Sequence, residues 1–197
     1  MFARTERLLL RPGWREDAPA LAAALGDEGI VRNLATAPWP YGLKDAETFL
    51  DREQGPSGTS FLLFRRTGGA PRLVGAAGFG ATPDGEVELG YWIARPYWGL
   101  GYATEGAQAV IDLVRDSLRM RRLIAGHFLD NPASARVLAK LGFRPTGRVL
   151  PRFSLARRTA APCREMALDL GGVAGAPDDV EAACGRRSAF NFAVMAA

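Results

Sequence analysis

The sequence predicts a single domain with a mixed α/β fold. The first observation behind this prediction is the stretch 86–118, which passes from a strand-like segment through a Gly-x-Gly loop into a helix-like segment. The second is that segments with the period of a strand and segments with the period of a helix both occur along residues 5–170. The third is an ordinary globular composition over 197 residues, enough to bury one core. We expect the domain to cover residues 1–170 and a Gly/Ala-rich tail to cover 171–197.

Turn-forming and capping residues divide the first part of the chain. Proline and glycine end strands and helices, and an aspartate before an apolar periodic segment is typical of a helix N-cap. These signals predict, in order, a strand at 5–11, a helix capped by Asp17 and ended by Gly26, an irregular loop with aromatic contacts at 30–43, and a helix capped by Asp45 that extends to Glu53.

The rest of the domain is predicted from alternation, glycine-containing turns and one proline helix start. Two strands at 60–66 and 72–80 flank a turn rich in glycine, which is typical of a hairpin. Asn131 followed by Pro132 indicates a helix start, and Gly142 ends that helix. The other predicted elements are a turn at 82–85, a strand at 122–129 and two strands in the regions 147–157 and 163–170.

The stretch 86–118 changes its period at the glycine loop. Before the loop, alternate residues fall on opposite faces of a strand, with Val87, Leu89, Tyr91 and Ile93 on one face and Glu86, Glu88, Gly90 and Trp92 on the other. After the loop, apolar residues recur at helical spacing, at Ala103, Ala107, Val110, Ile111, Val114 and Leu118. A strand, a Gly-x-Gly loop and a helix therefore follow one another.

The first turn of that helix is a candidate anion site. It leaves backbone N–H groups without partners inside the helix and carries the positive end of the helix dipole. Gly99 and Gly101 have no Cβ, so the backbone of residues 98–104 can approach a pyrophosphate closely. The alternative is a plain strand-to-helix turn that needs glycine for its dihedral angles.

Two better-known phosphate loops do not fit the same residues. A P-loop ends in Gly-Lys-Ser/Thr, whereas Tyr102 and Ala103 follow Gly101 here. A dinucleotide-binding loop has a third glycine where this chain has Thr104. A nucleoside triphosphatase is therefore disfavoured, and the dinucleotide pattern is incomplete.

The remaining composition limits the class of function. No apolar run reaches membrane-spanning length and the N-terminus has no signal-peptide pattern, so we expect a cytoplasmic protein without a membrane partner. Cys163 and Cys184 show no metal-ligand spacing, and the single histidine, His127, is expected to be a strand residue with a local partner. No metal is therefore predicted. The net charge of +4 comes from scattered arginines, which makes nucleic acid a minority choice of partner.

Two spaced motifs together resemble one protein family. They are the stretch 98–105 (WGLGYATE) and the segment from Asn131-Pro132-Ala133-Ser134 to Leu138-Ala139-Lys140-Leu141-Gly142-Phe143. With the opening residues 5–11, they closely resemble the GCN5-related N-acetyltransferases (GNAT), specifically the ribosomal-protein N-terminal (RimJ/RimL-type) branch. The likeness covers roughly residues 5–170 and is specific for the family, although not for the substrate.

The resemblance implies the GNAT fold and a way of binding acetyl-CoA. The fold is a central, mostly antiparallel twisted sheet flanked by about four helices. Its fourth and fifth strands run parallel and splay apart to admit the pantetheine arm. The backbone of Ile93 and Ala94 would bond the pantetheine amides, and Asn131 would approach from the other side, serve as a helix cap, or do both. The pyrophosphate would lie on Trp98, Gly99, Leu100, Gly101, Tyr102, Ala103 and Thr104.

Direct acetyl transfer needs a neutral amine, a polarised thioester carbonyl and a proton for the leaving thiolate. An α-amino group has a pKa of about 7.7–8.0, against about 10.4 for lysine, so a protein N-terminus is easier to deprotonate. The branch that the chain resembles places a general base at Glu88, and Glu86 could act instead if the strand carries a bulge. Ser134 either assists the departing thiolate or only supplies polarity early in its helix.

Two departures from the family pattern keep an alternative open. Pro96 stands where many members have Gln or Arg, and Leu138 where many have a tyrosine acid. The first hypothesis is an acetyl-CoA-dependent N-acetyltransferase whose amine acceptor is a protein N-terminus or a small amine such as a polyamine or an aminoglycoside. The alternatives are a non-catalytic acyl-CoA-binding sensor and, more weakly, an arginine-rich RNA-binding module. Whether the chain forms a homodimer stays open.

Overall fold

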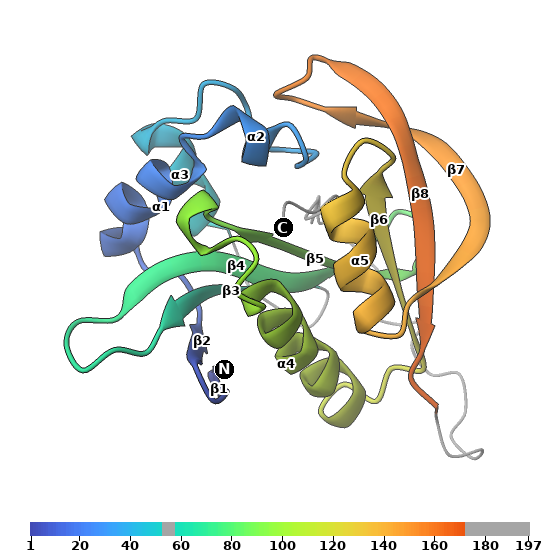
Figure 1. Cartoon of the computed structure of the whole chain (residues 1–197), viewed down its shortest axis with the longest axis horizontal. Helices are drawn as coiled ribbons and strands as arrows, with labels where there is room; N and C mark the ends of the chain where they lie inside the picture. The colour runs from blue at the N-terminus through green and yellow to red at the C-terminus, as the bar shows by residue number, and fades with distance from the viewer. Residues whose placement is uncertain (53–57, 172–197) are drawn as a thin grey trace.

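The centre of the molecule is one twisted sheet (Figure 1). The computed structural model describes residues 1–52 and 58–171. Its strands are β1 (Ala3–Arg4), β2 (Leu8–Arg11), β3 (Gly58–Arg65), β4 (Arg72–Ala81), β5 (Val87–Ile93), β6 (Arg122–Phe128), β7 (Arg144–Ser154) and β8 (Thr159–Asp169). They form an 8-stranded sheet in the order β1-β2-β3-β4-β5-β6-β8-β7. All neighbours are antiparallel except β5 and β6, which are parallel, so the predicted mixed fold is confirmed.

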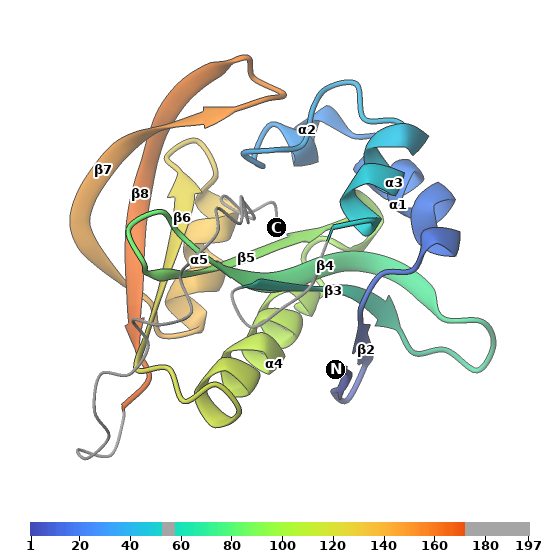
Figure 2. The same ribbon diagram turned by 180° about the vertical axis from the view of Figure 1, so that it is seen from behind.

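Helices cover both faces of the sheet (Figures 1 and 2). Within the described residues they are α1 (Ala18–Leu25), α2 (Glu28–Val31), α3 (Leu43–Leu50), α4 (Tyr102–Asp116) and α5 (Pro132–Lys140). Two 3₁₀ turns, η1 (Arg15–Asp17) and η2 (Arg95–Tyr97), precede α1 and follow β5. About four helices were expected from the sequence. The additional helix is α2, which has only 4 residues and is too short to show a helical period.

The alternation predicted for β5 decides which core each side chain enters. Leu89, Tyr91 and Ile93 are buried in the core cluster that contains residues of α4 and α5. Trp92, on the opposite face, is buried in the cluster that contains residues of α1, α2 and α3. The strand thus has one face toward α4 and α5 and another toward the first three helices, as its period indicates.

The first predicted strand, 5–11, is interrupted near its start. The Thr5 N–H donates to the Leu8 carbonyl at 3.0 Å, and the Thr5 hydroxyl accepts from the Leu8 N–H at 2.9 Å. This turn separates β1 from β2, which pair with each other. The apolar pattern of this segment did not predict the turn, because the leucines that suggested a strand lie after it.

Two predicted caps have other roles. Asp17 stands at the N-cap position of α1, but its carboxylate accepts bonds from the Arg11 guanidinium at 2.7 Å instead of capping the helix. Asp45 lies inside α3, whose N-cap is Gly42, and accepts from the Gly42 N–H at 2.9 Å. A carboxylate three residues past the cap can therefore be mistaken for the cap itself.

The loop predicted at 30–43 begins inside α2. Asp27 caps this short helix by accepting from the Gly29 N–H at 2.8 Å. Glu53, the predicted end of the helix at α3, and the tail from residue 172 onward lie outside the described residues. Among residues 1–52 and 58–171, no helix combines the length and apolarity needed to span a membrane.

Candidate active site

Strands β5 and β6 diverge beyond a single point of pairing. Their ladder consists of one residue pair, Glu88 with Ile124, and Figure 1 shows the two strands running apart from there. The Ala94 N–H donates to β4 at 2.8 Å, so the backbone groups of even-numbered residues of β5 face β4. Those of Tyr91 and Ile93 therefore face the gap toward β6. The sheet offers main-chain donors and acceptors along this gap.

The open end of the gap leads to the glycine loop. Gly99 has φ +74° and Gly101 has φ +82°, which is the left-handed region that glycine tolerates best. Gly101 is the N-cap of α4, and the first bond within the helix runs from the Glu105 N–H to the Gly101 carbonyl at 3.1 Å. The N–H groups of residues 101–104 therefore have no partner inside the helix and form an anion-binding end. This geometry fits the diphosphate of coenzyme A.

Arg7 holds this loop in place, a role that sequence reasoning missed. Glu105 accepts from the Thr5 hydroxyl at 2.5 Å, from the Arg7 N–H at 2.9 Å and from Arg7 Nε at 2.7 Å. Arg7 Nη1 also donates to the Leu100 carbonyl at 2.9 Å, and its guanidinium lies 4.6 Å from the centre of the Tyr102 ring. Burial opposes ionisation of Glu105, but these hydrogen bonds outweigh it and lower its pKa.

Trp98 connects the loop to the strand. Its Nε1 donates to the Ile93 carbonyl at 2.6 Å, and the Arg95 guanidinium lies 4.5 Å from the centre of its ring. Arg95 also forms an ion pair with Asp27 at the start of α2. Pro96 occupies the position at which many members of the family have Gln or Arg, and the residue before it, Arg95, is an arginine.

The two residues expected to bond pantetheine differ in their free groups. The Ala94 N–H donates to the Val74 carbonyl at 2.8 Å, and its own carbonyl accepts from the Tyr97 N–H at 2.9 Å. Both of its backbone groups are therefore engaged within the protein. The Ile93 N–H points toward the gap, which favours Ile93 over Ala94 as a contact for an amide in the gap.

Glu88 is buried at the closed end of the gap, with only 6% of its surface exposed. Its Oε1 accepts from Arg152 Nη1 of β7 at 2.6 Å. Burial raises the pKa of Glu88, and the Arg152 guanidinium partly opposes that rise. A carboxylate in this setting is a candidate general base, because its affinity for a proton exceeds that of an ordinary glutamate.

Glu86 has a different environment. It lies before the start of β5, is only partly buried, and its Oε1 lies 3.7 Å from Arg122 Nη1. The β4–β5 register runs without a shift, so no bulge carries Glu86 to the position of Glu88. The geometry favours Glu88 over Glu86 as the base.

Ser134 lies on the α5 side of the sheet, opposite the face that carries Glu88. It is fully buried, and its hydroxyl is 3.3 Å from the Tyr91 hydroxyl. Its N–H donates to Asn131 Oδ1 at 3.2 Å, which confirms Asn131 as the cap of α5. Burial raises the pKa of Tyr91, so its phenol keeps its proton at neutral pH and can act as a hydrogen-bond donor. Sequence reasoning missed Tyr91, which it placed only in the core.

The single histidine and the cysteine within the described residues are both buried. His127 is a buried residue of β6 whose Nδ1 lies 3.0 Å from the Phe128 carbonyl, so it has a local partner as predicted. Cys163 is buried, and burial raises its pKa to about 11, which disfavours a thiolate. Cys184 lies outside the described residues. Over residues 1–52 and 58–171, no group of three or more His, Cys, Asp or Glu side chains could hold a metal ion.

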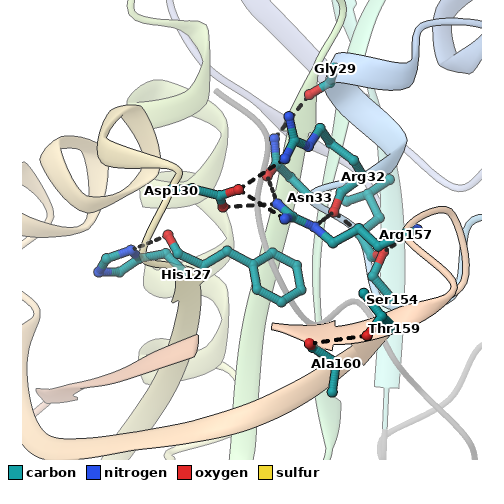
Figure 3. A network of polar contacts seen from close by, with 11 residues as sticks. Gly29, Arg32, Asn33, His127, Asp130, Ser154, Arg157, Thr159 and Ala160 are labelled. Carbon is teal, nitrogen blue, oxygen red and sulfur yellow. Dashed lines mark hydrogen bonds and ion pairs between the residues drawn. The ribbon is translucent and has the colours of Figure 1, made fainter. Parts of the chain in front are cut away.

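Arg157 fastens the turn between β7 and β8 to the segment after α2 (Figure 3). It binds both carboxylate oxygens of Asp130 at 2.8 Å and donates to the Arg32 carbonyl at 2.6 Å and to Asn33 Oδ1 at 3.2 Å. Its guanidinium also lies 4.5 Å from the centre of the Phe128 ring. The turn, the segment after α2 and the loop before α5 therefore form one hydrogen-bonded unit beside the gap.

We expect Arg157→Ala to lower the free energy of unfolding by about 2–3 kcal/mol, because hydrogen bonds to charged groups contribute this much. The melting temperature should fall by roughly 5–10 °C in thermal denaturation. Arg32→Ala is the matched control, since its ion pair with Asp130 at 3.0 Å joins two half-exposed side chains. Arg32→Ala should lower the free energy of unfolding by less than about 1 kcal/mol. Equal losses in the two variants would contradict the role given to Arg157.

Comparison with known proteins identifies the family. The family profile described as "Acetyltransferase (GNAT) domain" matches residues 7–144. The uncharacterized N-acetyltransferase YoaA of Bacillus subtilis (strain 168) is 31% identical over 155 residues, which cover 73% of this chain and 82% of YoaA.

Solved structures show the same fold. A GNAT-family acetyltransferase from Bacillus anthracis superposes with a TM-score of 0.73 at 23% identity, covering 86% of this chain and 99% of that protein. The ribosomal-protein alpha-N-acetyltransferase RimL, solved with coenzyme A, superposes with a TM-score of 0.70 at 17% identity, covering 86% and 98%. Since the family profile spans most of the domain and the YoaA relative agrees with it, the chain belongs to the GNAT family of N-acetyltransferases.

Proposed function

We propose that the protein transfers the acetyl group of acetyl-CoA directly to a primary amine, and that it belongs to the RimJ/RimL-type branch. The observation that carries this proposal is the gap between β5 and β6. It ends at the N–H groups of residues 101–104 on one side and at the buried Glu88 on the other. Main-chain groups, an anion-binding helix end and a carboxylate thus lie along one path.

Acetyl-CoA supplies the activated acyl group. The residues of this chain bind and orient acetyl-CoA and the acceptor, and they transfer protons. The diphosphate would lie on the loop from Trp98 to Thr104, and the Ile93 N–H would bond an amide of the pantetheine arm. Asn131 would face the arm from the start of α5. These contacts use groups fixed by the fold, so little reorganisation is needed on binding.

Glu88 would remove a proton from the acceptor ammonium, directly or through a water molecule. An α-amino group, with its pKa of about 7.7–8.0, needs less help than a lysine side chain. On the other side of the sheet, the Ser134 hydroxyl would donate a hydrogen bond toward the leaving sulfur, and the Tyr91 hydroxyl 3.3 Å away would orient it. The proton that neutralises the thiolate would come from water or from the ammonium of the new amide bond. The base and the hydroxyl that assists the thiolate then lie on opposite faces of β5.

Release of free thiol from acetyl-CoA in the presence of a panel of amines tests this function. The panel should contain short peptides with free N-termini, spermidine and an aminoglycoside. We expect at least one acceptor to release thiol in step with a mass increase of one acetyl group. Tight coenzyme A binding without transfer to any amine would favour the sensor alternative. Salt-dependent RNA binding without coenzyme A binding would favour the RNA-binding alternative.

Arg152→Gln is expected to move the acidic limb of the pH profile of kcat/KM upward by about 1–2 pH units. Arg152 opposes the rise in the pKa of Glu88, so its removal raises that pKa further and leaves less carboxylate at neutral pH. Arg152→Lys should largely restore the profile, because the charge is kept.

The control for this prediction is Arg148→Gln on the same strand. Arg148 is 60% exposed and pairs with Glu165 at 3.5 Å. The charge of Glu165 is the smallest of the influences on the pKa of Glu88, so the loss of Arg148 should move the profile far less than the loss of Arg152 does. An acidic limb that stays in place in Arg152→Gln would show that Glu88 does not set it.

A further inference from the structure

A cavity lies on the α1–α3 side of the sheet, apart from the gap and the glycine loop. Its volume is about 210 Å³, and its lining includes Tyr41, Asp45, Thr48, Phe49, Trp92 and Leu155. A cavity of roughly 150 Å³ with apolar walls already holds a benzene ring. The space is therefore large enough for one aromatic or branched apolar side chain.

The cavity and the proposed base lie on the same face of β5, because Trp92 lines the cavity. Trp92 and Glu88 stand on the same face of β5 with Gly90 between them, a separation of about 13 Å along the strand. The proposed base and the residue that lines the cavity therefore lie on one strand. A peptide advances by about 3.3–3.6 Å per residue, so one with its amino group at Glu88 reaches the cavity within its first few residues.

Hydrogen bonds fix the walls of the cavity. The Leu155 N–H donates to the Ala35 carbonyl at 3.0 Å, and the Ser154 hydroxyl donates to the Leu34 carbonyl at 2.9 Å. The turn between β7 and β8 and the loop after α2 are thus joined across the cavity. A preformed cavity lowers the ordering cost of binding.

The charges on the lining argue against a polycation. The ionisable carboxylate and guanidinium that line the cavity, Asp45 and Arg52, have opposite charge. The Arg52 guanidinium lies 5.4 Å from the centre of the Phe49 ring, where it would repel a second ammonium group. The remaining lining is mainly aliphatic and aromatic, so the cavity favours an apolar group.

We infer that the cavity binds an apolar side chain within the first three residues of an amino-terminal peptide acceptor. This inference rests on the proposed function, since it places the acceptor amine beside Glu88. The acceptor is recognised at two points: its amino group at the charged end of the face, and its apolar side chain at Trp92. A polyamine satisfies only the first of these points.

Kinetics with matched peptides test the inference. Peptides that differ only in having Phe or Asp at the second or third residue are compared with spermidine. We expect kcat/KM to favour the best Phe peptide over its Asp counterpart by about 10- to 100-fold, the range expected from burying one aromatic side chain. A preference for spermidine or for the Asp peptides would overturn the inference.

Thr48→Trp narrows the cavity from its rim, because Thr48 is an exposed residue of α3 that lines it. It should abolish the preference for Phe while the rate with the Asp peptides stays within about threefold. Lys44→Trp adds the same side chain to an exposed position of α3 outside the lining and should keep the preference. If both variants keep the preference, the cavity is not the site.

Binding separates this inference from the proposed function. The Phe and Asp peptides are titrated calorimetrically into wild-type protein and Thr48→Trp in the presence of coenzyme A, with no transfer required. Selective binding of the Phe peptide that Thr48→Trp removes would uphold the cavity assignment even if no acceptor were acetylated. Absence of selective binding would overturn it even if some amine were acetylated.

Discussion

Glu88→Gln is expected to lower kcat/KM for the acceptor by about 10²- to 10⁴-fold, the usual contribution of a positioned general base. Glutamine keeps the size of the side chain and can still accept from Arg152, but it cannot take a proton. Since Glu88 lies at the closed end of the gap and not on the glycine loop, the affinity for coenzyme A should stay within about threefold of wild type. Thiol-release kinetics and calorimetric titration measure the two quantities.

Glu86→Gln is the control for this prediction. Glu86 is partly exposed, pairs with Arg122 at 3.7 Å and lies outside the regular ladder of β5. Its loss should change kcat/KM by less than about threefold, as expected for a long, solvent-accessible ion pair. A large loss in Glu86→Gln with nearly full activity in Glu88→Gln would assign the base to the other carboxylate. Thermal denaturation of both variants checks that each is folded.

Gly99→Val is expected to weaken coenzyme A binding at least tenfold. Gly99 has φ +74°, and a β-branched residue avoids this region, so the peptide groups of the loop must rotate. The N–H groups that face the anion site then lose their common direction. The dissociation constant from calorimetric titration measures the effect.

Gly85→Val provides a control with similar backbone strain at a distant place. Gly85 has φ +82° in the turn between β4 and β5, and a Cβ added at Gly85 or at Gly99 would meet no atom within 4 Å. Both variants should therefore lose similar thermal stability, while only Gly99→Val loses affinity. Equal affinity in the two variants would mean that the loop conformation does not matter for binding.

Local patterns predicted the elements around the gap because their causes are local. The alternation of Leu89, Tyr91 and Ile93 follows from one strand having a core on either face. Asn131 and Pro132 predicted the start of α5 because a cap and its helix are adjacent in sequence. The left-handed turns at Gly99 and Gly101 were signalled by the absence of a side chain.

The contacts that sequence reasoning missed join residues far apart in the chain. Arg152 reaches Glu88 across 64 residues, and Arg7 reaches Glu105 across 98. The hydroxyls of Tyr91 and Ser134 belong to a strand and a helix that meet only in the folded protein. No periodicity encodes such partners, although the resemblance had marked Glu88 and Ser134 themselves. The pairing of β5 with β6 at one point likewise came from the resemblance and not from the pattern of either strand.

Coenzyme A binding to the wild-type protein can be measured by calorimetric titration. We expect saturable heat with one site per chain, because the gap between β5 and β6 and the anion-binding loop lie on a single path. A titration that gives no heat of binding at several temperatures would contradict the claim that the gap and the glycine loop hold this molecule.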